Sequence, residues 1–219
     1  MTAEGILPAT TTPGRVAYRV NDLDQVSRFY ETVIGLDVQV TSEDRAVLGS
    51  GGDPLVVLDA DPDAPPRGND ETGLFHTAFL VPSRAALGDA LERIEANWQL
   101  DGASDHVVSE ALYLSDPEGN GVEVYRDRPQ ETWPVSDDGT VGIDTKPLDI
   151  AGVRDAARGG ESSRDKKENH GLELVPDATT IGHVHFEVSS LPKARKFYVD
   201  ALGMGLKQRY RNSAAPLNH

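Results

Sequence analysis

The chain has 219 residues, enough for one large domain or two small ones, and its 38% hydrophobic content can fill a packed core. A net charge of −15, from 36 acidic and 21 basic residues, argues against nucleic acid and anionic membranes as partners and resembles the solubilising charge of proteins from a salty cytoplasm. The absence of cysteine excludes disulfides, thiolate nucleophiles and cysteine-ligated zinc.

The first predicted elements follow an N-terminus that has neither the positive start nor the apolar run of a signal peptide, so we expect a soluble, cytoplasmic protein. Alternation predicts a strand over residues 14–20, and helical spacing predicts a helix that Asp22 caps and Gly35 ends. Short strands are expected at residues 37–41, 45–48 and 55–58. The order is one strand, one helix and three strands.

The same βαβββ order is predicted again after a connector rich in Pro and Asp. It comprises a strand at residues 75–81, a helix at 83–97 that Ser83 caps, and strands near 106–108, 111–115 and 122–125. In the last strand Glu123 lies between Val122 and Val124, so its carboxylate points to the opposite face. If both faces are covered, this carboxylate must be paired or metal-bound, whereas on a half-solvated sheet it is a surface residue.

A third copy starts late in the chain, because residues 181–204 align without gaps on residues 13–36. We expect an N-terminal domain at residues 1–128 with units at about 13–59 and 73–126. A linker with a short helix is expected at 129–178, and the start of a second, truncated domain at 179–219. An incomplete third unit would expose a sheet edge, which a second copy of the chain could cover in a homodimer.

The repeats carry a family resemblance. The Phe-Tyr pairs ahead of Gly35 and Gly203, together with Asp-Pro-Glu-Gly-Asn-Gly-Val-Glu at residues 116–123, resemble the vicinal oxygen chelate superfamily of glyoxalase I, bleomycin-resistance proteins and extradiol dioxygenases. Residues 102–121, with Asp-Arg-Pro at 127–129 and Trp-Pro at 133–134, are similar to two-domain catechol 2,3-dioxygenase-like proteins. The resemblance implies an α+β fold of paired βαβββ units and Fe(II)-dependent cleavage of a small catechol-type substrate.

Superposing the repeats places Arg15, His76 and His183 at one position, five residues before the valine that ends each first strand. The resemblance implies metal ligands on the first and last strands of paired units, which nominates His76, His183 and Glu123. Two imidazoles and one carboxylate suit Fe(II) or another divalent metal and leave positions open for substrate and dioxygen. The resemblance also implies acid/base and hydrogen-bonding roles near the metal for His106 and Tyr113, although packing on the inner face would equally explain Tyr113.

Arg15 departs from this pattern, because a guanidinium cannot ligate a cation. If units one and two share a site, we expect Arg15 to pair with Glu123 in a metal-free N-terminal half. His183 would then lack its partner ligands, which would lie beyond residue 219, and the chain would be inactive alone. A glyoxalase-type metal-dependent lyase and a non-catalytic binding module of the bleomycin-resistance type are the alternative functions.

Overall fold

The computed structural model describes residues 6–8, 10–66, 68, 71–137, 139–159, 168–169 and 172–206. Unit one contains β1 (Val16–Val20), α1 (Leu23–Phe29), a π-helical turn η1 (Tyr30–Ile34), β2 (Asp37–Thr41), β3 (Arg45–Ser50) and β4 (Asp53–Ala60). The Asp22 side chain accepts a hydrogen bond from the Gln25 backbone N–H, and Gly35 ends the helix with a φ of 86°. Both predicted helix ends are confirmed.

Unit two contains β5 (Gly73–Leu80), α2 (Arg84–Asn97), β6 (Gly102–Asp105), β7 (Ser109–Ser115) and β8 (Gly121–Asp127). The predicted cap is confirmed, since the Ser83 side chain accepts from the Ala86 N–H. The strand predicted near residues 106–108 is present, but it lies earlier, as β6, and its predicted position is wrong. Val107 has a φ of 71°, and its N–H donates to the Asp105 carboxylate, so a tight turn joins β6 to β7 there.

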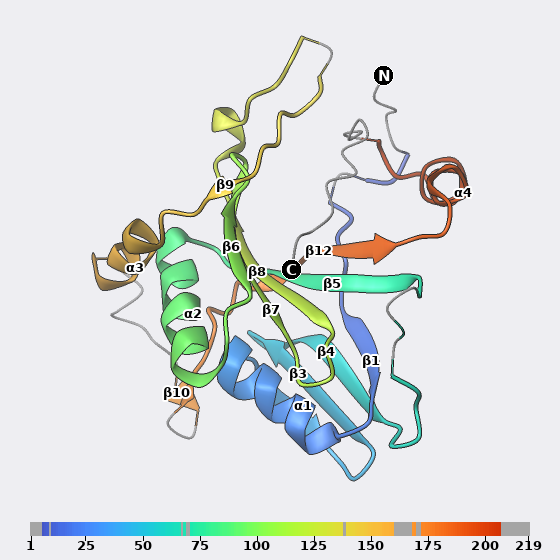
Figure 1. The fold of residues 1–219 in the computed structure, drawn as a ribbon, viewed down its shortest axis with the longest axis vertical. Coiled ribbons are helices and arrows are strands. Elements are labelled where there is room, and N and C mark those ends of the chain that lie inside the picture. Colours follow the sequence, from blue (N-terminus) through green and yellow to red (C-terminus); the bar gives the residue numbers. More distant parts are fainter. Residues whose placement is uncertain are drawn as a thin grey trace.

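The segment between units two and three contributes several elements to the fold. They are a short 3-10 turn η2 (Gln130–Thr132), β9 (Lys146–Pro147), α3 (Ile150–Gly159), β10 (Glu168–Asn169) and β11 (Leu172–Glu173). Helix α3 confirms the predicted short helix and packs beside α2 (Figure 1). Its Val153 is fully buried. Of the predicted flexible linker, residues 160–167 lie outside the described residues. The domain boundaries stay a prediction.

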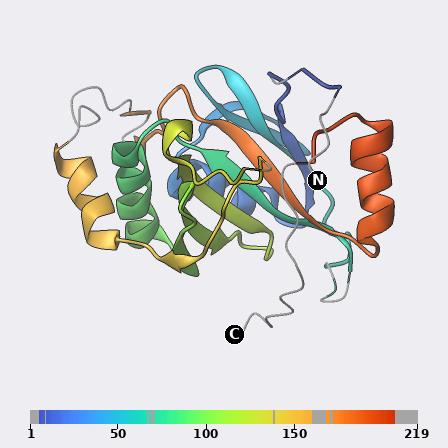
Figure 2. The same cartoon turned by 90° about the horizontal axis from the view of Figure 1, so that it is seen from above.

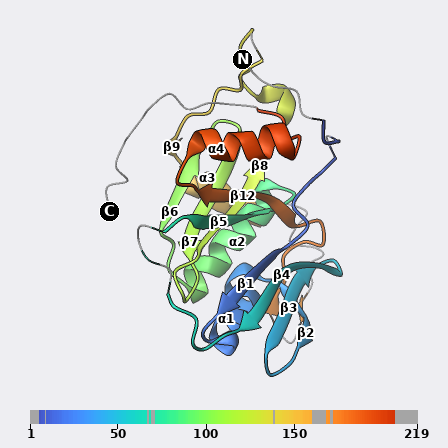
Figure 3. The same ribbon diagram turned by 90° about the vertical axis from the view of Figure 1, so that its right-hand side faces the viewer.

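The third unit supplies β12 (Thr180–Glu187), α4 (Leu191–Arg195) and a π-helical segment η4 (Lys196–Ala201). Strand β12 runs antiparallel to β5, the first strand of unit two (Figure 3). The larger sheet therefore has the order β12-β5-β8-β7-β6-β9, whereas β1 belongs to a separate sheet of order β1-β4-β3-β2. We expected units one and two to share a site, but it is the first strand of unit three that lies beside unit two.

The two faces of the six-stranded sheet differ in character. One face packs into the main core with α1, α2 and the four-stranded sheet, through residues that include Phe79, Leu112, Val124 and Ile181. Seen from above, α2 and α3 lie at one end of the molecule and α4 lies at the other (Figure 2). The opposite sheet face carries a small second cluster of Ala78, Ala111 and Tyr125, and it is the face toward which alternation directs Glu123. We call it the site face.

The helical part of unit three exposes side chains whose repeat equivalents in unit one are buried. Phe197 is 57% exposed, whereas Phe29, its equivalent in the alignment, is 2% exposed. Strand β12 is also the terminal strand of its sheet among the described residues. The homodimer stays a prediction. None of the described helices is both long and apolar enough to cross a membrane.

Candidate metal centre

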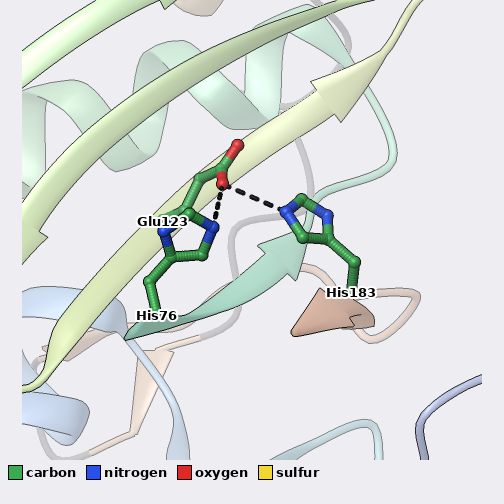
Figure 4. A group of neighbouring side chains, drawn as sticks. All are labelled: His76, Glu123 and His183. Atoms are coloured by element: carbon green, nitrogen blue, oxygen red, sulfur yellow. Dashed lines mark ion pairs between the residues drawn. The ribbon is translucent and has the colours of Figure 1, made fainter. Parts of the chain in front are cut away.

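Three side chains with ligand-type atoms converge on the site face, one from each of three neighbouring strands. They are His76 on β5, Glu123 on β8 and His183 on β12, and one ligand atom from each lies within 4.8 Å of the other two (Figure 4). Glu123 Oε2 is 3.0 Å from His76 Nε2 and 3.2 Å from His183 Nε2. One carboxylate oxygen thus lies beside two imidazole nitrogens.

Strand register explains this convergence. Ala78 of β5 is the register partner both of Glu123 on β8 and of His183 on β12, so His183, Ala78 and Glu123 form one row across the sheet. His76 lies two residues before Ala78 on the same face of β5. The small Ala78 side chain leaves room for its two longer neighbours. Gly121, the register partner of His76, allows β8 to lie close to β5, because a Cβ there would overlap the Phe75 carbonyl.

Burial and charge distinguish the three residues. Glu123 is 3% exposed and His76 is 8% exposed, whereas the His183 side chain is 43% exposed. Burial alone would raise the pKa of Glu123, but the adjacent imidazoles of His183 and His76 outweigh burial and lower the pKa to about 2. The site therefore holds an ionised carboxylate in a largely dry setting, with its open side at His183.

The donor atoms fit a divalent metal ion. Two ligands held at right angles about 2.1 Å from one ion are about 3 Å apart, which matches the two contacts of Glu123 Oε2. His76 Nε2 is buried and, although 3.0 Å from that oxygen, is not aligned for a hydrogen bond with it or with any other described group. An unsatisfied imidazole nitrogen beside an ionised carboxylate is the arrangement expected of two ligands that share an ion.

Tyr113 and His106 extend this cluster toward the sheet edge. Tyr113 on β7 is the register partner of Glu123, and its hydroxyl lies 3.4 Å from Glu123 Oε1 and 2.8 Å from His106 Nε2. His106 Nδ1 lies 3.2 Å from the carbonyl oxygen of Asp144. The five residues proposed from the sequence are therefore joined in one network, which the Asp144 carbonyl completes.

Two expectations about this site are wrong. Arg15 is exposed, and no ion pair among the described residues joins it to Glu123, whose carboxylate contacts two histidines instead. The cause is topological, because β12 rather than β1 lies beside β5. For the same reason two candidate ligands, His76 and Glu123, lie beside His183 within the chain.

Several residues at the site received no role from the sequence. The His185 ring lies 4.9 Å from that of His76, and the Tyr125 ring lies 4.9 Å from that of His183. Alternation could have found both, since each lies two residues after a nominated ligand on the same strand. No sequence signal marks the Asp144 carbonyl, because a backbone group in an irregular segment carries no pattern.

Comparisons with known proteins agree with the fold. The profile of the Glyoxalase/Bleomycin resistance protein/Dioxygenase superfamily matches residues 12–124. A catechol-2,3-dioxygenase of Bacillus subtilis (strain 168) is 37% identical over 206 residues, which cover 92% of this chain and 68% of that protein.

Two solved structures superpose on parts of the chain. The cppA protein from Streptococcus pneumoniae TIGR4 has a TM-score of 0.47 at 11% identity, over 78% of this chain and 58% of its own. A glyoxylase/bleomycin resistance protein/dioxygenase domain from Frankia sp. EAN1pec has a TM-score of 0.46 at 21% identity, over 56% of this chain and 96% of its own. From the profile match and the Bacillus relative, the chain belongs to the glyoxalase/bleomycin resistance protein/dioxygenase superfamily.

Proposed function

We propose that the chain binds Fe(II) through His76, Glu123 and His183 and acts as an extradiol dioxygenase on a catechol-type substrate. The observation that carries this proposal is the convergence of two imidazoles and one carboxylate on the site face. This donor set is the one that non-haem Fe(II) oxygenases use, with positions left open for reactants. The 37% identity to a catechol-2,3-dioxygenase supports the choice of reaction.

When bound, Fe(II) would supply Lewis acidity and coordination positions at which the two vicinal substrate oxygens and dioxygen meet. The protein would hold it with one full negative charge from Glu123 and two neutral imidazoles. The partly exposed His183 marks the side from which a small molecule can approach, while Glu123 and His76 are shielded from water.

The chain's own groups can move a proton beside this centre. The Tyr113 hydroxyl has one proton, which it can donate either to Glu123 Oε1 or to His106 Nε2. When His106 Nδ1–H donates to the Asp144 carbonyl, Nε2 is free to accept that proton. A proton released by a substrate hydroxyl next to Tyr113 can therefore pass to His106 at the sheet edge.

The alternatives receive less support from this arrangement. A metal-free binding module was favoured by an Arg15–Glu123 ion pair, and the exposed Arg15 removes that argument. A glyoxalase-type lyase would also need a metal, and no observation on the site face favours it over ring cleavage.

Anaerobic reconstitution with Fe(II), followed by iron analysis and a turnover assay with catechol, tests the proposal. We expect near one iron per chain and a yellow ring-cleavage product. Glu123→Gln should abolish both, whereas Glu92→Gln on α2, whose side chain pairs with Arg158 of α3, should change neither. Iron-free protein that binds small ligands would favour the binding module, and bound iron without ring cleavage would contradict the proposed reaction.

A further inference from the structure

The alternation of side chains between the two sheet faces is interrupted in β12 at Gly182. Ile181 is the register partner of Phe79 and is 1% exposed in the main core, whereas His183 is the partner of Ala78 and lies on the site face. In a regular strand, residues two apart share a face. From Ile181 to His183 the chain advances two residues along β12, whereas their partners Phe79 and Ala78 are adjacent in β5. Gly182 is therefore the extra residue of a β-bulge.

The bulge decides where the His183 side chain points. Without it, Ile181 opposite Phe79 would place His183 opposite Thr77, whose side chain is fully buried on the core face. A register shift of one residue moves every side chain of a strand to the other face. The metal centre would then keep His76 and Glu123 but lose its third ligand.

Tyr125 occupies the space next to this bulge. It is 6% exposed, it projects from β8 on the site face, and its ring meets the His183 ring at 62° with centroids 4.9 Å apart. A Cβ at position 182 would overlap the Tyr125 hydroxyl and would come within 2.7 Å of the ring carbon Cζ and 2.9 Å of the Leu80 Cβ. Any side chain at position 182 would therefore force this phenol or the Leu80 side chain to shift.

We propose that Gly182 and Tyr125 form a positioning pair that keeps the bulge in β12 and turns His183 toward the metal centre. Neither residue is a ligand. The inference rests on the metal centre of the proposed function, and it adds the reason why this third strand presents a ligand where regular alternation would not.

Titration of the metal-free protein with Co(II), followed by its visible absorption, tests the pair without any turnover. Gly182→Ala should weaken Co(II) binding by about 10- to 100-fold, the range typical of residues that orient metal ligands. Gly102→Ala is the matched control, because a Cβ there meets nothing within 4 Å, and it should bind as the unchanged protein does. Circular dichroism of each variant establishes that it is folded.

A double-mutant cycle identifies the cause. Tyr125→Ala alone should also weaken binding, and adding Gly182→Ala to it should cause a smaller loss than Gly182→Ala causes alone, because the two closest overlaps are with the phenol and only the approach to the Leu80 Cβ remains. Unaltered affinity in Gly182→Ala, or fully additive losses in the double variant, would overturn the inference. If Gly182→Ala does not fold, unaltered affinity in Tyr125→Ala overturns it instead. Failure of the unchanged protein to bind Co(II) would refute the proposed metal centre itself.

Discussion

His183→Ala should remove most of the metal-dependent stability of the protein, and Arg15→Ala should remove none. The two residues occupy the same position in their repeats, but only His183 lies beside Glu123, at 3.2 Å. Loss of one of three ligand side chains should weaken binding at least as much as loss of an orienting residue, so we take about 100-fold.

The size of the effect follows from linkage. At a metal concentration of about 100 Kd, binding stabilises the native state by about 2.7 kcal/mol, and a 100-fold weaker site leaves only about 0.4 kcal/mol. Since about 1 kcal/mol shifts Tm by about 2–4 °C in a chain of this size, the metal should raise Tm by about 5–10 °C in the unchanged protein. In His183→Ala the rise should be about 1 °C.

Thermal unfolding with and without Zn(II) or Co(II), at one fixed metal concentration, measures these shifts. Arg15→Ala should retain the full shift. A His183→Ala protein that keeps the full shift, or an Arg15→Ala protein that loses it, would refute the assignment of ligands to units two and three.

Three further predictions concern the relay, the buried charge and the strand spacing. His106→Ala should lower turnover about 100-fold without altering the iron content, because His106 contacts Tyr113 rather than a proposed metal ligand. Loss of iron from this variant would contradict a proton-transfer role for His106. Glu110 is 2% exposed and binds the guanidinium groups of three arginines, so Glu110→Ala should cost about 3–5 kcal/mol in urea unfolding. A loss below about 1 kcal/mol would show that this cluster does not contribute to stability. Gly121→Ala should lower the unfolding free energy by about 1–3 kcal/mol, since its Cβ would overlap the Phe75 carbonyl, and an unchanged midpoint would contradict the close approach of β5 and β8.

Local pattern was sufficient for much of the fold and for the choice of the three candidate ligands. Period-2 alternation placed Glu123 on the face opposite Val122 and Val124. In the structure both valines lie in the main core. Superposed repeats placed His76 and His183 at one position, and the structure brings both to the same carboxylate.

Which strands would be neighbours could not be predicted from the repeats. Equivalent positions in three copies do not determine which two copies share a sheet, and the pairing of β12 with β5 joins residues about 100 apart in the sequence. The expected Arg15–Glu123 contact failed for that reason.

Two local irregularities were also beyond sequence pattern. The bulge at Gly182 lies against the Tyr125 ring of another strand, and Val107, with a positive φ, lies in the turn that separates β6 from β7. Both depend on contacts that alternation does not encode.

A crystal structure of the protein soaked with Co(II), with the ion located by its anomalous scattering, tests the ligand assignment most directly. The account predicts one ion bound by Nε2 of His76, Nε2 of His183 and the carboxylate of Glu123, with Arg15 distant from it. An ion bound elsewhere, or His183 turned into the main core while the ion lies between units one and two, would contradict it.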